Sequence, residues 1–223
     1  MIPRAPVLRT ALTLLALAAF LAACQSGGSG DADRDVPTEA SEVKPLLTGT
    51  AIPASTLQTV EGDSVALRGL ISQAPTVLIF YRGGWCPYCN RHLAELQRIE
   101  SQLTDIGYQI LAISADRPEM LQELRLDRAP EYTLLSDASM QTARDFGLAF
   151  RVDLETVQRY RENGMDLEER SGYDHHQLPV PAVFLVNPDG TVTFQYVHPD
   201  YRNRIDSDVL LAAARAYHPD AGE

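Results

Sequence analysis

From about residue 46 to residue 218, the hydrophobic and polar positions alternate between short β-branched runs and stripes at helical spacing. This alternation is typical of a sheet connected by crossover helices, so the predicted fold class is α/β. Thr76 to Tyr81 is a continuous apolar run, which predicts a central strand covered on both faces. An amphipathic helix is predicted next, from about Pro87 to Leu103. Its apolar stripe consists of Leu93, Leu96, Ile99 and Leu103.

Turn residues and shorter runs predict the remaining elements. We expect hairpins around Glu61–Asp63 and Asn187–Gly190, because both segments contain residues favoured in tight turns. A polar, weakly periodic stretch from Val152 to Leu178 is interpreted as an insertion with one helix near Leu154–Glu162. The other predicted elements are strands at Thr56–Val60, Ser64–Leu67, Gln109–Ser114, Thr133–Leu135, Ala182–Val186 and Thr191–Val197, and helices that start at Pro118, span Ser139–Phe146, and run from Asp206 or Ser207 to about Tyr217.

The N-terminus has the pattern of an export signal. Arg4 and Arg9 are its only charges, and an apolar run from Ala11 to Ala23 completes it. This run is shorter than the ~20 residues that a transmembrane helix needs, so a permanent span is the weaker interpretation. Residues 25–45 are rich in Gly, Ser, Asp and Glu and have little apolar surface to bury, which predicts a flexible tether.

The segment Leu21–Cys24, with the sequence Leu-Ala-Ala-Cys, resembles the lipobox of bacterial lipoproteins. This resemblance implies cleavage before Cys24 and lipidation of that cysteine; the alternative is an ordinary secretory peptide with an unrelated cysteine. The expected organisation is a signal peptide at 1–23, a tether at 24–45 and one domain at 46–218. Gln25 in place of Asp resembles the sorting pattern for the outer membrane, so we expect a cell-envelope lipoprotein, on the periplasmic face of the outer membrane in a Gram-negative source.

Charge narrows the classes of partner. The chain has a formal net charge of −11, and loss of Arg4 and Arg9 with the signal peptide makes it −13. Such a surface repels phosphate, so no nucleic-acid partner is expected. A multi-chain lipid anchor does not need basic residues to stay at a membrane, so the membrane contact is assigned to the anchor alone.

With Cys24 assigned to lipidation, Cys86 and Cys89 form one close pair where a buried strand ends and a helix begins. Unpaired amides at a helix N-terminus stabilise a thiolate, so Cys86, on the exposed side, is the expected nucleophile. Cys89, one turn deeper, is expected to close a disulfide with it. A structural disulfide would close too small a loop to stabilise much. Half of a zinc site is the other alternative, with His175 and His176 as candidate ligands, but no metal or other cofactor is predicted.

The cysteine segment resembles that of peroxiredoxin-like proteins of the AhpC/TSA group. The matching segments are Phe80–Leu93, Ile113–Asp116, Leu134–Asp137 and Val180–Val186, within a likeness that extends from about Leu47 to Ala216. The resemblance implies a thioredoxin-like fold, with a central mixed sheet flanked by helices, an N-terminal hairpin and an insertion before the strand that follows a cis-proline.

The same resemblance implies roles for residues around the cysteines. Pro181 stands where the thioredoxin fold places a cis-proline that helps to dock substrate, although the residue alone would read as an ordinary edge-strand proline. Trp85 and Tyr88 are expected to shape an apolar rim, with packing as the alternative for Trp85. Arg82 is a candidate for substrate binding.

Departures from the family pattern separate its two chemistries. Peroxidatic members resemble Pro-x-x-x-Thr-x-x-Cys with a distant Arg. An ungapped comparison places Arg82 at the Pro, Cys86 at the Thr, Cys89 at the peroxidatic Cys, and Pro181 about where the distant Arg would lie. Thiol-disulfide exchange with a protein or small-molecule thiol or disulfide is therefore the leading hypothesis.

Two other functions stay open. Peroxide reduction is the alternative, with Arg82 or Arg91 supplying the missing charge. A non-catalytic envelope scaffold or metal-binding lipoprotein is a third possibility. His92, His175 and His176 are interpreted either as bases near the cysteines or as solvated loop residues.

Overall fold

The computed structural model describes residues 36–128 and 132–220. The expected signal peptide and the expected lipidation site, Cys24, lie outside these residues. None of the helices within 36–128 and 132–220 is long and apolar enough to cross a bilayer.

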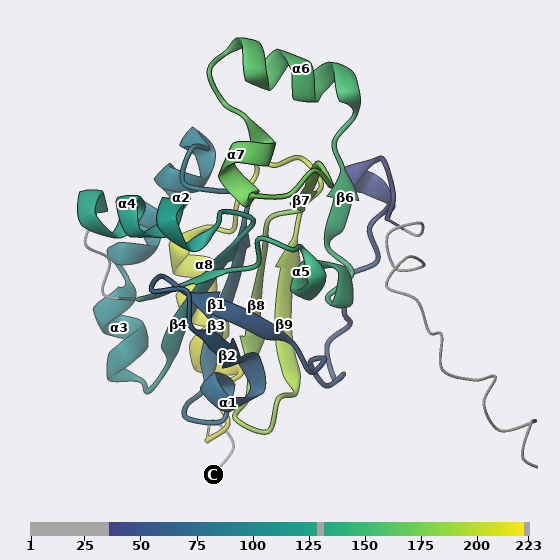
Figure 1. Ribbon diagram of the computed structural model, residues 1–223. Helices are drawn as coiled ribbons and strands as arrows, with labels where there is room; N and C mark the ends of the chain where they lie inside the picture. The colour runs from purple at the N-terminus through teal and green to yellow at the C-terminus, as the bar shows by residue number, and fades with distance from the viewer. Residues whose placement is uncertain (1–35, 129–131, 221–223) are drawn as a thin grey trace, which may run out of the picture. The chain divides into compact units, whose positions relative to one another are not determined.

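A mixed sheet of seven strands forms the centre of the described residues, in the order β2-β1-β5-β4-β3-β8-β9 (Figure 1). The three neighbours β3, β4 and β5 are parallel, and β8 pairs antiparallel with β3. The parallel strands therefore end at the same edge of the sheet, where the cysteine segment begins. The strands are β1 (Thr56–Thr59), β2 (Ser64–Ala66), β3 (Thr76–Tyr81), β4 (Gln109–Ser114), β5 (Thr133–Ser136), β8 (Ala182–Val186) and β9 (Val192–Val197).

Helices cover both faces of this sheet, and every side chain of β3 is therefore buried. Val77, Ile79 and Tyr81 point to the face that packs against α2 (Pro87–Gln97), α3 (Glu100–Asp105), α4 (Pro118–Arg128) and α8 (Ser207–Ala216). Leu78 and Phe80 point to the other face, which α1 (Leu67–Ile71) and α5 (Gln141–Asp145) cover. The α/β class and the mixed sheet flanked by helices are confirmed.

The insertion forms its own small structure. Strands β6 (Ala149–Arg151) and β7 (Gln177–Pro179) pair antiparallel, and between them lie α6 (Leu154–Glu162) and α7 (Leu167–Ser171). Figure 1 shows α6 and α7 in green beyond the end of the sheet at which α2 begins. The helix α6 has the predicted bounds. The strands β6 and β7 and the helix α7 were not predicted, because each strand has only three residues and the segment is strongly polar.

One predicted helix is two helices. The chain leaves helical geometry between α2 and α3, where Ile99 has φ −107° and ψ 1° and its N–H donates to the carbonyl of Leu96. All four residues of the predicted stripe are buried against the same face of the sheet. The apolar spacing was therefore right, and the break changes the direction of the chain without exposing the stripe.

The predicted tether is too long at its C-terminal end. The compact unit begins at Val36, and a short 3-10 turn, η1 (Ala40–Glu42), lies within the expected tether. The amide of Arg151 donates to the carbonyl of Pro37 at 2.8 Å, and the amide of Leu46 donates to the carbonyl of Phe146 at 3.2 Å. These backbone bonds order residues 36–45 although the segment has little apolar surface, which is why composition alone did not reveal the contact.

Candidate active site

Cys86 and Cys89 lie at the N-terminus of α2, directly after the buried strand β3. Cys86 is the N-cap with extended backbone angles, and Pro87 occupies the first turn, where its missing N–H costs no hydrogen bond. The amide of Cys86 donates to the carbonyl of Gly83 at 3.1 Å, which closes the turn between strand and helix. Both sulfurs are free thiols in this structure.

The two cysteines have opposite electrostatic environments. The side chain of Cys89 donates a hydrogen bond to Cys86 and lowers the pKa of Cys86 to about 6, aided by the amides of Cys89 and Tyr88 and by the charge of Arg82. The same hydrogen bond and burial raise the pKa of Cys89 well above its usual value. At neutral pH the pair is therefore a thiolate at Cys86 and a thiol at Cys89.

Cys86 is less accessible than the sequence predicted. Only 1% of Cys86 and none of Cys89 is exposed, so the expectation of an exposed nucleophile is wrong. Two rings from segments distant in the sequence pack around the neighbouring residues. Tyr160, in α6, contacts Trp85, and Tyr201, in the loop before α8, contacts Tyr88. Neither tyrosine belongs to the segment Phe80–Leu93, so the sequence motif around the cysteines did not predict them.

Arg82 holds these rings together. Its guanidinium carbon lies 4.2 Å from the ring centroid of Tyr201, 4.9 Å from that of Trp85 and 5.7 Å from that of Tyr160. Its Nη2 also donates to the hydroxyl of Tyr160 at 2.5 Å. Tyr88 makes an edge-to-face contact with Tyr201, with centroids 5.5 Å apart. The structure thus brings Arg82, Trp85 and Tyr88 together next to the cysteine pair and adds two tyrosines, while the predicted roles of the three in substrate binding stay predictions.

A buried carboxylate fixes the loop before Cys86. Asp116, two residues after β4, accepts a hydrogen bond from the amide of Gly84 at 2.6 Å, and its Oδ1 lies 3.3 Å from Nε of Arg170 in α7. Burial raises the pKa of Asp116 to about 6, and the charge of Arg170 opposes that rise. Asp116 therefore connects the cysteine loop with the insertion, a role that its position at a strand end did not reveal.

Arg204 is another residue at the site that sequence reasoning missed. Its Nη2 donates to the sulfur of Cys89 at 3.5 Å, and its charge lowers the pKa of that thiol against the larger effects that raise it. No motif contains Arg204, so the sequence carries no signal for this contact. For peroxide reduction, the sequence instead suggests Arg82 or Arg91 as the source of the missing positive charge. In the structure, the guanidinium carbon of Arg91 lies 5.6 Å from the ring centroid of Tyr88.

The three candidate histidines, His92, His175 and His176, have different environments. His92 is buried on α2, and burial together with the charge of Arg204 lowers its pKa to about 4, so it is neutral and weakly basic. Nε2 of His175 bonds the carbonyl of Ala138 at 2.8 Å, and Nε2 of His176 bonds a carboxylate oxygen of Glu168 at 2.7 Å. His175 and His176 thus stabilise the insertion and are partly buried, which differs from both predicted roles.

Pro181 lies at the expected edge of the sheet but with a different backbone. Phe80 pairs with Ala182, so Pro181 stands beside the end of β3 that carries the cysteine loop. The Val180–Pro181 bond is trans, since the residues that the structure describes contain no cis peptide, and this corrects the expected cis-proline. A trans bond is the lower-energy form, and here it continues the extended backbone from β7, where the amide of Val180 donates to Leu148.

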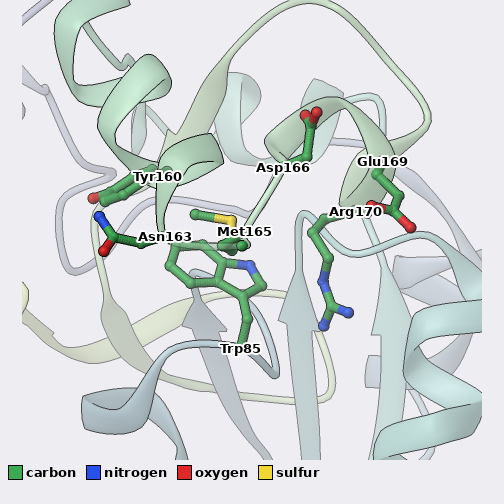
Figure 2. A pocket seen from close by; sticks show the side chains of 8 residues that line it. Trp85, Tyr160, Asn163, Met165, Asp166, Glu169 and Arg170 are labelled. Atoms are coloured by element: carbon green, nitrogen blue, oxygen red, sulfur yellow. The ribbon is translucent and has the colours of Figure 1, made fainter.

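A pocket of about 480 Å³ opens between the insertion and the cysteine loop. Figure 2 shows the indole of Trp85 in its centre, with Met165 behind it and Arg170 alongside. Its size is within the range of small-molecule sites. The lining residues are Trp85, Tyr160, Asn163, Gly164, Met165, Asp166, Glu169 and Arg170.

Comparison with curated proteins gives relatives of two kinds. The chain is 25% identical to Peroxiredoxin Bcp of Escherichia coli over 169 residues, which cover 76% of this chain and 96% of that protein. It is 23% identical to the thiol-disulfide oxidoreductase ResA of Halalkalibacterium halodurans over 134 residues, which cover 60% of this chain and 73% of that protein.

Solved structures of peroxiredoxins share the fold. The crystal structure of Peroxidoxin BcpB from Mycobacterium tuberculosis matches with a TM-score of 0.58 at 22% identity, covering 76% of this chain and 96% of that one. Reduced Prx3 from Vibrio vulnificus in complex with hydrogen peroxide matches with a TM-score of 0.62 at 17% identity, covering 76% and 99%. The model of the AhpC/TSA family matches residues 48–195, which include the cysteine pair, β1 to β8 and the insertion. The chain therefore belongs to the AhpC/TSA family of thiol-dependent redox enzymes, with the thioredoxin-like fold of peroxiredoxins.

Proposed function

We propose that this protein is a thiol-disulfide oxidoreductase in which Cys86 is the nucleophile and Cys89 the resolving thiol. The observation that carries the proposal is the opposite shift of the two pKa values, to about 6 for Cys86 and well above normal for Cys89. A thiolate beside a protonated partner is the arrangement that dithiol exchange requires.

The steps follow from this arrangement. The Cys86 thiolate attacks one sulfur of a substrate disulfide, forms a mixed disulfide and releases the other sulfur as a thiolate. Cys89 then loses its proton to solvent and attacks the sulfur of Cys86, which releases the second substrate thiolate and leaves the Cys86–Cys89 disulfide. The substrate is reduced by two electrons and the protein is oxidised by two; the same steps in reverse oxidise a substrate dithiol.

A trapping experiment tests the order of these steps. The Cys89→Ser variant, mixed with an oxidised substrate such as a protein disulfide, is expected to accumulate a covalent adduct that dithiothreitol removes. Cys86→Ser is the matched control and should form no adduct under the same conditions. Failure of Cys89→Ser to form an adduct, or equal trapping by Cys86→Ser, would overturn the proposal.

Peroxide reduction is a second candidate because Arg204 lies against Cys89, the residue that aligns with the peroxidatic position. In that chemistry a thiolate attacks the peroxide, is oxidised to a sulfenic acid and releases water or an alcohol; the other cysteine then condenses with it, releasing water. The high pKa of Cys89 disfavours this assignment. Stopped-flow mixing with hydrogen peroxide separates the two: a second-order rate no greater than that of a free thiol of similar pKa excludes a dedicated peroxidase.

We also propose that the domain is held in the cell envelope by a lipid on Cys24, as the sequence Leu-Ala-Ala-Cys supports. Its substrates would then be exported thiols and disulfides. Expression of the full chain with a radiolabelled fatty acid is expected to label the wild type and not Cys24→Ser. Equal labelling of both, or release of the wild type as a soluble protein during fractionation, contradicts this anchor.

A further inference from the structure

The pocket next to Trp85 has a charge that the proposed chemistry does not use. Trp85 precedes Cys86 directly, so a ligand in this pocket lies against the loop that carries the nucleophile. The aromatic rings of Trp85 and Tyr160 and the thioether of Met165 offer apolar contact, while Asp166, Glu169 and Arg170 bring charge (Figure 2). The net charge available to a ligand depends on which of these groups already have partners.

Two arginines around the pocket, Arg170 and Arg161, are paired with carboxylates among the described residues. Arg170 pairs with the buried Asp116 at 3.3 Å, and Arg161 pairs with Asp166 at 2.8 Å. Arg82 is 4% exposed, and its charge acts on the thiolate of Cys86. Arg161 and Arg170 are therefore neutralised by carboxylates of the protein itself, and Arg82 is buried away from a ligand in the pocket.

Glu169 remains as the unpaired charge on the pocket wall. It is exposed, and it makes no ion pair within residues 36–128 and 132–220. Because Asp166 and Arg170 are both paired, Glu169 leaves the lining with one uncompensated negative charge, in a pocket that also has aromatic walls. A ligand with an apolar body and a positive group matches both features.

We propose that this pocket binds a cationic group carried close to the reacting sulfur of the substrate, as in an aminothiol disulfide or a cysteine peptide with a neighbouring lysine. The inference rests on the proposed disulfide exchange and specifies its substrate class. The pocket itself takes no part in bond making; Glu169 acts as a specificity-determining residue that favours encounter and binding of the cationic substrate.

Two nearly isosteric disulfides test the charge preference. Reduced protein is mixed with cystamine, which carries an ammonium at each end, or with bis(2-hydroxyethyl) disulfide, which is neutral, and the second-order rate of oxidation is measured at pH 7.5. Glu169→Gln is expected to lower the cystamine to hydroxyethyl rate ratio about threefold, and to leave the rate with the neutral disulfide unchanged. The test is repeated with peptide disulfides that carry Lys, Gln or Glu beside the cysteine. If Glu169→Gln lowers the Lys to Gln rate ratio more than the cystamine to hydroxyethyl ratio, the cation comes from a peptide; the opposite result assigns it to a small aminothiol.

Glu155→Gln is the matched control, since Glu155 is an exposed acid of the same insertion that does not line the pocket. It removes the same overall charge and should leave both ratios near the wild-type value. If Glu169→Gln changes neither ratio, or changes them only as much as Glu155→Gln, the inference is overturned. If neither disulfide oxidises the wild type, the proposed function fails instead.

Binding is measured separately from turnover because Trp85 is the single tryptophan of the chain. Titration of the reduced protein with 2-(methylthio)ethylamine, which cannot exchange disulfides, is expected to change the tryptophan emission to saturation. The apparent dissociation constant should rise about threefold in Glu169→Gln, and the neutral 2-(methylthio)ethanol should bind both proteins equally. Absence of a saturable change in the wild type would overturn the inference even if exchange is fast.

Discussion

Nη2 of Arg204 donates a hydrogen bond to the sulfur of Cys89 across 3.5 Å, although 115 residues separate the two in the sequence. The hydrogen bond from Cys89 to Cys86 is the largest cause that raises the pKa of Cys89, and Arg204 opposes it. Once Cys86 is in a mixed disulfide it carries no negative charge, so its effect on Cys89 falls while that of Arg204 remains. In the proposed exchange, Arg204 is therefore placed to favour the Cys89 thiolate at the step in which Cys89 attacks the mixed disulfide.

Replacement of Arg204 should slow resolution without slowing the first attack. In Arg204→Gln we expect release of the second substrate thiol to be roughly three- to tenfold slower at pH 7, because an opposite charge near the sulfur is lost. Single-turnover measurement with a chromogenic mixed disulfide gives both steps. Arg202→Gln is the control, since Arg202 is exposed and pairs with Asp200; equal slowing in both variants would contradict the role of Arg204.

The reactivity of Cys86 should follow its pKa of about 6. We expect the rate of alkylation by iodoacetamide to be near its maximum at pH 7.5 and to fall as the pH decreases through about 6, because the thiolate is protonated there. In Cys89→Ala the midpoint should move upward, since the hydrogen bond from Cys89 is the first cause of the shift. A midpoint that is the same in both proteins would show that helix amides and Arg82 suffice.

A stabilised thiolate also favours the reduced form of the couple. The reduction potential of Cys86–Cys89 is therefore expected to lie above the about −270 mV of thioredoxin, whose nucleophilic cysteine has a pKa of about 7. Equilibration with glutathione redox buffers and quantification of the free thiols measures this potential. A value below that of thioredoxin would contradict the electrostatic description of the pair.

Asp116 should make stability depend on pH. Its folded pKa of about 6 is above the ordinary 3.8, so its contribution is complete below about pH 4 and is lost as the pH rises through about 6. Wild type should lose up to about 3 kcal/mol from this group between pH 4 and 7.5, a loss that Asp116→Asn should lack. Urea denaturation at both pH values measures the difference, and parallel pH profiles of the two proteins would contradict it.

Gly83 should tolerate no side chain. A Cβ atom there would overlap Nε1 of Trp85 and lie 2.9 Å from Oδ1 of Asp116. Gly83→Ala should displace Trp85, change its emission and lower the exchange rate roughly 10- to 100-fold, because small shifts near reacting atoms are costly. Gly69→Ala is the control, since nothing lies within 4 Å of the corresponding Cβ. An unchanged rate in Gly83→Ala would show that the position of Trp85 does not matter.

The linear pattern of residues was sufficient for most of the sheet and for the location of the cysteine pair. The apolar run Thr76–Tyr81 and the run Gln109–Ser114 became β3 and β4 with the predicted bounds, because strands buried on both faces leave a continuous apolar signal. The spacing of Cys86 and Cys89 at a strand end likewise sufficed to place them at a helix start. The dipole and free amides there are properties of the backbone and depend little on distant residues.

Only the tertiary structure decided what surrounds the two sulfurs. Tyr160 and Tyr201 reach Arg82 from the insertion and from the loop before α8, and Arg204 reaches Cys89; no local pattern records such contacts. Burial, the trans bond before Pro181 and the pairing of Asp116 with Arg170 were also decided at this level. The physical reason is that exposure and local electric field are sums over neighbours in space, whereas hydrophobic periodicity reports only neighbours along the chain.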